Sequence, residues 1–155
     1  MRFLKFIIEG VVLNNFLFNQ KALFENLSLL LLRLFIGGTF LGYGISKIQK
    51  FESFYLPWFT DKLGIPFPEL SLSLVIFFQI VGGVAIILGL FTRVFTIPLF
   101  LIMLVAMLTV NIHNGFNTAP NFGYEINLAY MSILFILFSY NSGKFSLENI
   151  LFKRD

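Results

Sequence analysis

Six polar side chains in this 155-residue chain could take part in binding or proton transfer, and each lies inside an apolar run or near the end of one. They are a tyrosine, a lysine, two amides, a histidine and a glutamate: Tyr43, Lys47, Gln79, Asn111, His113 and Glu125. Imidazole and carboxylate groups can transfer protons. Phenol and amide groups can hydrogen-bond a polar headgroup such as that of a quinone. We therefore predict His113 and Glu125 as catalytic residues, beside a pocket formed by the other four.

Each of these residues also has a purely structural interpretation. Glu125 and Lys47 could form a salt bridge between helices, and His113 could lie in a hydrated loop among its asparagine neighbours. Gln79 could hydrogen-bond a neighbouring helix without touching a ligand. At the level of the sequence both sets of interpretations stay open.

The composition excludes most other chemistry. The chain has no cysteine and a single histidine, which excludes disulfides, iron–sulfur clusters, thiolate zinc sites and a bis-histidine haem within one copy. We expect no metal site and no intrinsic cofactor, so a redox reaction would need a bound organic molecule such as a quinone. The sequence also contains no catalytic triad, phosphate-binding loop or dinucleotide-binding fingerprint.

The apolar content predicts the kind of protein that positions these residues. Hydrophobic residues make up 57% of the chain and charged residues 12%, whereas a soluble domain has roughly 25% charged residues. Four long apolar runs cannot all be buried inside one another in so short a chain, so their solvent must be lipid. We therefore predict an all-α integral membrane protein, a bundle of four transmembrane helices.

The predicted elements divide the chain into three parts. Residues 1–26 are too polar and too short to span a membrane. They favour an interfacial helix that lies on it over a disordered tail. Residues 144–155 predict an amphipathic cytoplasmic tail. Between them, the membrane domain of residues 27–143 contains four spans, at about 27–47, 70–93, 94–112 and 124–140.

The longest loop, residues 48–69, holds three of the five prolines and the only tryptophan. A loop this apolar should not extend freely into water. We expect it to lie in the membrane interface or to fold over the mouth of the bundle, with Tyr55 and Trp58 at headgroup depth.

Residues with structural roles are also predicted within the spans. Arg33 is costly in lipid, so it either anchors to a lipid phosphate or forms an internal salt bridge. Small residues permit close helix contact. They comprise the GxxxG pair Gly38 and Gly42, the neighbouring Gly37 and Gly44, and the second-span pair Gly82 and Gly83.

The basic residues predict the orientation. Eight of the eleven lysines and arginines fall on the side that holds both termini, and three on the other, so the positive-inside rule puts both termini in the cytoplasm. The six chemistry-bearing residues then gather toward the outer end of the bundle, under the loop 48–69. Since the basic residues are scattered beside apolar runs, they favour contact with lipid headgroups over nucleic acid.

Six segments form a family pattern by their order and spacing: Leu29–Phe51, Leu63–Leu70, Gln79–Arg93, His113–Gly115, Gly123–Glu125 and Ser142–Asn149. Together they resemble the DoxX family of small four-span membrane proteins over about residues 28–150. Many members have a glutamate where this chain has Gln79 and a histidine where it has Tyr43. Each replacement removes an ionisable group that proton chemistry would use.

The resemblance implies a function in a membrane complex. DoxX-like proteins are often described as oxidoreductases because relatives resemble small subunits of quinone-linked oxidases, and others in the wider group act as assembly factors or scaffolds. We expect a small or accessory subunit of a quinone-linked redox assembly in the bacterial cytoplasmic membrane, in contact with lipid and other membrane subunits. The alternatives are a non-catalytic scaffold and, less favoured by the absence of repeat symmetry, a small-molecule transporter.

Overall fold

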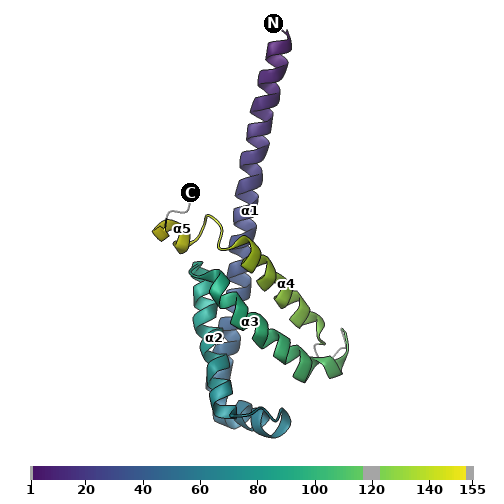
Figure 1. Cartoon of the computed structure of the whole chain (residues 1–155), viewed down its shortest axis with the longest axis vertical. Coiled ribbons are helices and arrows are strands. Elements are labelled where there is room, and N and C mark those ends of the chain that lie inside the picture. The colour runs from purple at the N-terminus through teal and green to yellow at the C-terminus, as the bar shows by residue number, and fades with distance from the viewer. Residues whose placement is uncertain (1, 117–122, 153–155) are drawn as a thin grey trace.

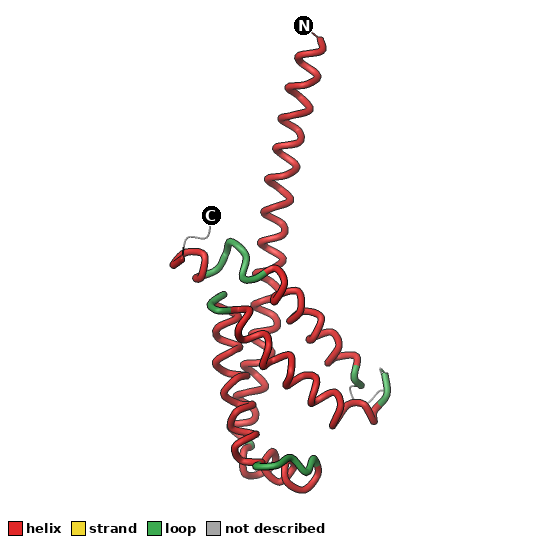
Figure 2. The backbone as a smooth tube through the Cα atoms, in the orientation of Figure 1, coloured by secondary structure: helices red, strands yellow, loops and turns green. Residues whose placement is uncertain are grey.

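The structure, a computed structural model, describes the backbone of residues 2–116 and 123–152, and the side chains in these ranges from Gln20 onward. These residues form helices, helical turns and loops, without a strand (Figure 2). The helices are α1 (Arg2–Gln49), α2 (Pro68–Leu88), α3 (Thr92–Ala106), α4 (Glu125–Tyr140) and α5 (Leu147–Phe152). The predicted all-α fold class is confirmed. The last three residues of the predicted tail lie outside the described part.

Within the described residues, three helical stretches are long and apolar enough to cross a membrane. They are Gln20–Gln49 in α1, Pro68–Leu88, and Thr92–Asn114, which is α3 with the helical turns that come after it. The fourth apolar helix, α4, has 16 residues, a length of about 24 Å against a hydrocarbon core of about 30 Å. Helices that could span a membrane are therefore present, but a bundle of four full-length spans is not confirmed.

The first helix continues without a break from Arg2 to Gln49. Figure 1 shows it extending past the other helices toward the N-terminus. A separate interfacial helix over residues 1–26 is not confirmed. Nothing in the sequence ends a helix near residue 27, because neither glycine nor proline occurs between Gly10 and Gly37. On the exposed surface, Lys21 and Glu25 form a salt bridge of 3.9 Å one helical turn apart.

Glycines bring α2 into close backbone contact with the C-terminal half of α1, beside which it lies in Figure 1. A Cβ added at Gly37 would lie 2.8 Å from the carbonyl oxygen of Gly83, and one added at Gly83 would lie 2.8 Å from that of Gly37. Gly44 makes a similarly close approach to α2. By contrast, Gly38 and Gly42 have nothing within 4 Å of an added Cβ. The predicted GxxxG pair therefore faces away, because neighbouring positions on a helix point about 100° apart.

The second helix also meets α3, which in turn packs along α4. Gly82 faces Leu99 of α3, whose nearest side-chain atom would lie 3.2 Å from an added Cβ. Gly82 thus lies in the contact of α2 with α3, and Gly83 in the contact of α2 with α1. A buried apolar cluster joins all four long helices: Ile36, Phe40, Ile86, Leu99, Met103, Leu134 and Leu137.

Arg33 ties the helices together at one end of the bundle. Its side chain is 1% exposed. Nη2 donates to the carbonyl oxygens of Ile87, at 3.2 Å, and Phe145, at 2.8 Å. Nη1 donates to the carbonyl oxygen of Ser142. The carbonyl of Ile87 belongs to the last turn of α2, where helix geometry leaves carbonyl groups unpaired. The other two belong to the segment after α4.

This arginine contact differs from both predicted alternatives for Arg33. The side chain is too buried to anchor to a lipid phosphate, and among the described residues it pairs with no carboxylate. Further hydrogen bonds close the same end. The hydroxyl groups of Thr92 and Ser142 are 2.7 Å apart, and the backbone N–H of Lys144 donates to Asn26 Oδ1 at 2.6 Å. We call this group, with Arg33 at its centre, the arginine end.

The loop between α1 and α2 folds back at the opposite end. It consists of two π-helical turns, Phe51–Tyr55 and Trp58–Lys62, and then an irregular stretch. Phe59 is buried against Leu72 and Ile76 of α2. The loop therefore packs on the bundle, as predicted, while the membrane depth of its aromatic residues stays a prediction.

Candidate functional site

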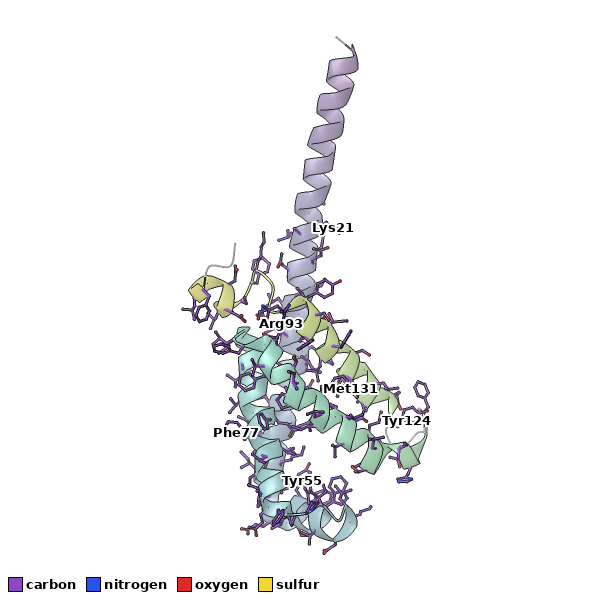
Figure 3. All side chains as sticks on the ribbon, in the orientation of Figure 1. Lys21, Tyr55, Phe77, Arg93, Tyr124 and Met131 are labelled. Carbon is purple, nitrogen blue, oxygen red and sulfur yellow. The ribbon has the colours of Figure 1, made fainter. Side chains whose placement is uncertain are left out.

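A cavity of about 510 Å³ lies at the loop end of the bundle. Its walls come from α1, the loop after it, α2, α3 and the turn after it, and the start of α4. Most of its lining is apolar. The polar and aromatic lining residues include Tyr43, Lys47, Tyr55, Trp58, Gln79, Asn111, Asn127 and Tyr130. In Figure 3 Tyr55 marks this end, and Arg93 marks the arginine end.

The last turns of α1 contribute a cation and an aromatic ring, and the loop contributes a second ring. Tyr43 and Lys47 are four residues apart and therefore lie on one helix face. Lys47 Nζ is 5.5 Å from the ring centre of Tyr43 and 5.2 Å from that of Tyr55 in the loop. Cation–π attraction at these distances holds the ammonium group beside the cavity. The loop is thus joined to α1 at the edge of the site.

Gln79 is the most deeply buried polar residue on the cavity wall. It is 1% exposed, and its Oε1 has no hydrogen-bond partner among the described residues. The missing side chain of Gly44 makes room for it, because a Cβ there would lie 3.3 Å from Gln79 Cβ. On α2, Ser71 and Val75 precede Gln79 at four-residue intervals and line the same cavity. A buried amide oxygen without a partner costs free energy, which a ligand that donates a hydrogen bond would recover.

Two asparagines join the third and fourth helices at the cavity. Asn111 Nδ2 donates to Asn127 Oδ1, and Asn127 Nδ2 donates to the carbonyl oxygen of Met103 at 3.2 Å. Asn127 is 3% exposed. The helix widens into a π-helical turn over Met107–Asn111, a distortion that is frequent at functional sites. The pair holds the two helices in register where they border the cavity.

Asn127 and Tyr130 are site residues that the sequence prediction did not include. They are three residues apart, so they share one face of α4. The ring of Tyr130 lies 6.5 Å from that of Tyr43 and 6.4 Å from that of Phe40, centre to centre. The available signal was a polar residue inside an otherwise apolar helix, because such a residue usually faces the interior of a bundle.

The structure brings four of the six predicted residues into one cavity and leaves the other two outside it. Tyr43, Lys47, Gln79 and Asn111 line the cavity, whereas His113 and Glu125 do not. His113 is exposed on the short helical turn Ile112–Asn114. Glu125 is half-buried in the first turn of α4. The arrangement is therefore a cavity with neither predicted proton-transfer residue on its wall.

Comparison with known proteins places this chain in a family. The model of the DoxX family matches residues 28–112. This chain belongs to the DoxX family. The matched DoxX stretch runs from the membrane part of α1 to just past the π-helical turn Met107–Asn111, and it contains Tyr43, Lys47, Gln79 and Asn111. It ends before His113, so the three later segments of the predicted resemblance lie beyond the matched residues.

A relative of this DoxX protein extends the similarity further along the chain. An uncharacterized protein of Haemophilus influenzae (strain ATCC 51907 / DSM 11121 / KW20 / Rd) is 27% identical over 141 residues, which cover 86% of this chain and 89% of that protein. No solved structure matches the chain. Family membership, together with helices long and apolar enough to span, identifies a DoxX-family membrane protein.

Proposed function

We propose that the cavity binds the headgroup of a lipid-soluble quinone, and that the chain is a small or accessory subunit of a membrane redox assembly. The observation that carries the proposal is the buried Oε1 of Gln79, which has no hydrogen-bond partner among the described residues and lies on the wall of a cavity of about 510 Å³. Binding sites for small molecules are largely apolar cavities with a few polar groups that orient the ligand. This cavity has that character.

The lining suits a planar ring with polar groups at its edge. The amide of Gln79 can both donate and accept hydrogen bonds, and the Lys47 ammonium group can donate to a ring oxygen. Tyr55 and Trp58 offer aromatic surface on the loop side. A bound quinone would supply two-electron redox chemistry, for which the side chains of this protein have no substitute. Because the chain has no cysteine and one histidine, the electron donor belongs to another subunit.

Replacing Gln79 with leucine tests the headgroup site. Trp58 is the only tryptophan and lines the cavity, so saturable quenching of its fluorescence by a short-chain quinone measures binding. We expect the wild-type protein to show saturation and Gln79→Leu to bind roughly tenfold more weakly, as expected for one buried hydrogen bond. The control is Gln49→Leu, which makes the same change at an exposed position. Equal affinity of both variants would reject Gln79 as a ligand-binding group.

We propose a face of α1 for the contact with the larger assembly. Gly38 and Gly42 are exposed, with open space around them, and a GxxxG surface suits close packing of a second transmembrane helix. We expect Gly38→Leu with Gly42→Leu to abolish co-purification of partner subunits from native membranes while the chain itself stays folded. The matched control is Leu74→Phe with Leu88→Phe, which enlarges exposed positions of a different helix, α2. Retention of the same partners by the glycine variant would contradict this contact.

The proposed arrangement in the membrane keeps the four spans and the orientation predicted from the sequence. We infer that α4 is a fourth, short crossing, accommodated by local thinning of the bilayer. Both termini then lie in the cytoplasm of a bacterial inner membrane, with the arginine end inside and the cavity end outside. The excess of basic residues on the terminal side supports this orientation.

A further inference from the structure

A second cavity, of about 310 Å³, lies in the groove between α3 and α4. Its lining includes Ile97 and Leu101 on α3, and Leu134, Phe135 and Phe138 on α4. The polar lining residue is Thr96, and its hydroxyl already donates to the carbonyl oxygen of Arg93 at 2.9 Å. The groove therefore presents a hollow apolar surface, and the hydroxyl group of Thr96 on its wall already has a hydrogen-bond partner.

This groove continues the quinone cavity along the same two helices. Leu101 lines both. On α3, Val105 lines the cavity and Ile97 lines the groove, each one helical turn from Leu101. On α4, Tyr130 lines the cavity and Leu134, one turn further, lines the groove. The two spaces thus meet end to end, and Figure 1 shows these helices running side by side.

We propose that the cavity and the groove together hold one amphipathic ligand, with its headgroup beside Gln79 and its hydrocarbon tail between α3 and α4. The inference rests on the proposed function and adds a second subsite, which selects for a tail. From Tyr130 to Phe138 the path along α4 is about 12 Å, since each helical residue rises about 1.5 Å. That length holds several carbons of a tail.

The groove is open to lipid, and this opening determines what the tail contributes to binding. Ile97 and Phe135 are 52% and 63% exposed, so the groove is open toward the surrounding lipid. A tail gains no hydrophobic free energy on leaving lipid, and dispersion contacts with a fitted surface hold it. Its role is orientation: the tail entering between the two helices directs the headgroup past Leu101 toward Gln79. The opening also gives a lipid-soluble ligand a lateral entrance.

The test compares two quinones in two matched variants. One quinone has no tail and the other carries a ten-carbon tail, and binding is measured by quenching of Trp58 in lipid nanodiscs. Ile97→Phe narrows the groove. Val94→Phe makes a comparable enlargement one turn earlier on α3, at a residue that is 61% exposed and lines neither space. Phenylalanine is used because a new tryptophan would add a second emitter.

The expected result is specific to one quinone in one variant. Ile97→Phe should weaken binding of the tailed quinone by roughly three- to tenfold, the size expected from a few lost dispersion contacts. It should leave binding of the tail-less quinone within about twofold, because that molecule does not reach the groove. Val94→Phe should leave both unchanged.

Other outcomes overturn the inference and separate it from the proposed function. Unchanged binding of the tailed quinone to Ile97→Phe would mean that bulk lipid fills the groove. An equal loss for both quinones would mean that the substitution distorts the cavity, which also rejects the tail site. If the tail-less quinone binds and depends on Gln79, the proposed function stands in either case. If neither quinone saturates the wild-type protein, the quinone proposal fails, and the tail site fails with it.

Discussion

Replacing Arg33 with methionine is expected to lower the free energy of unfolding by about 3 kcal/mol, because buried carbonyl groups lose the charged donor of their hydrogen bonds. Methionine fills much of the space of the arginine stem but donates no hydrogen bond. The carbonyl groups of Ile87, Ser142 and Phe145 would lose their donor in a place that water reaches poorly. Reversible unfolding in mixed micelles, monitored by circular dichroism, measures the change.

Arg93→Met is the matched control for this prediction. Arg93 is exposed and donates to a single carbonyl oxygen, that of Ser139, at 3.1 Å, so we expect a loss below about 1 kcal/mol. Arg33→Lys should fall between the two because a lysine ammonium group cannot reproduce the planar fork of a guanidinium. Equal stability of Arg33→Met and Arg93→Met would show that the arginine contact does not hold the bundle together.

Arg33 also illustrates what sequence reasoning can and cannot reach. A charge inside an apolar run signals that a specific partner exists, and the sequence prediction used that signal. The partners, however, are backbone carbonyls 54, 109 and 112 positions away. Every residue has such a carbonyl, so residue types contain no information about which ones are left unpaired. The packing of α1 against the end of α2 and the way the chain folds after α4 determine them.

Most of the predicted pocket residues do line the cavity, because the order of the helices alone places these residues at one end of the bundle. Tyr43, Lys47 and Asn111 lie near the ends of their helices at that end, and Gln79 lies deeper along α2. His113 comes two residues after Asn111, yet it lies outside the cavity. The π-helical turn Met107–Asn111 inserts a residue into the helical repeat. Even in a regular helix, however, residues two positions apart point about 200° apart, so Asn111 and His113 do not share a face.

The glycines show the limit of motif spacing. The GxxxG spacing indicated that α1 has a face of small residues. The helix in fact has two glycine faces, and the glycines that begin them are neighbours in the sequence. Gly37 and Gly44 contact α2, whereas Gly38 and Gly42 face outward. A shift of one residue along a helix decides between these faces, and the choice depends on the partner surface. Gly83 on α2 supplies that partner, and the sequence of α1 by itself does not specify it.

Gly83→Ala is expected to destabilise the protein by about 2–3 kcal/mol, a typical cost of overpacking a close contact. The added Cβ would lie 2.8 Å from the carbonyl oxygen of Gly37 and 3.1 Å from the backbone nitrogen of Leu41. Both are backbone atoms, so no side chain can rotate to make room, and α1 and α2 must separate. Separating the two helices is costly in lipid, because helix association there depends on close packing.

Two other glycines give graded controls for Gly83→Ala. At Gly82 the nearest atom to an added Cβ is a side-chain atom of Leu99, at 3.2 Å. Leucine can change rotamer, so Gly82→Ala should cost less, about 1 kcal/mol. Gly42→Ala meets nothing within 4 Å and should stabilise the helix by up to about 1 kcal/mol through the higher helix propensity of alanine. Unfolding in mixed micelles should therefore rank the variants Gly42→Ala, Gly82→Ala and Gly83→Ala in decreasing stability. A Gly83→Ala protein as stable as Gly42→Ala would mean that α1 and α2 do not approach through these glycines.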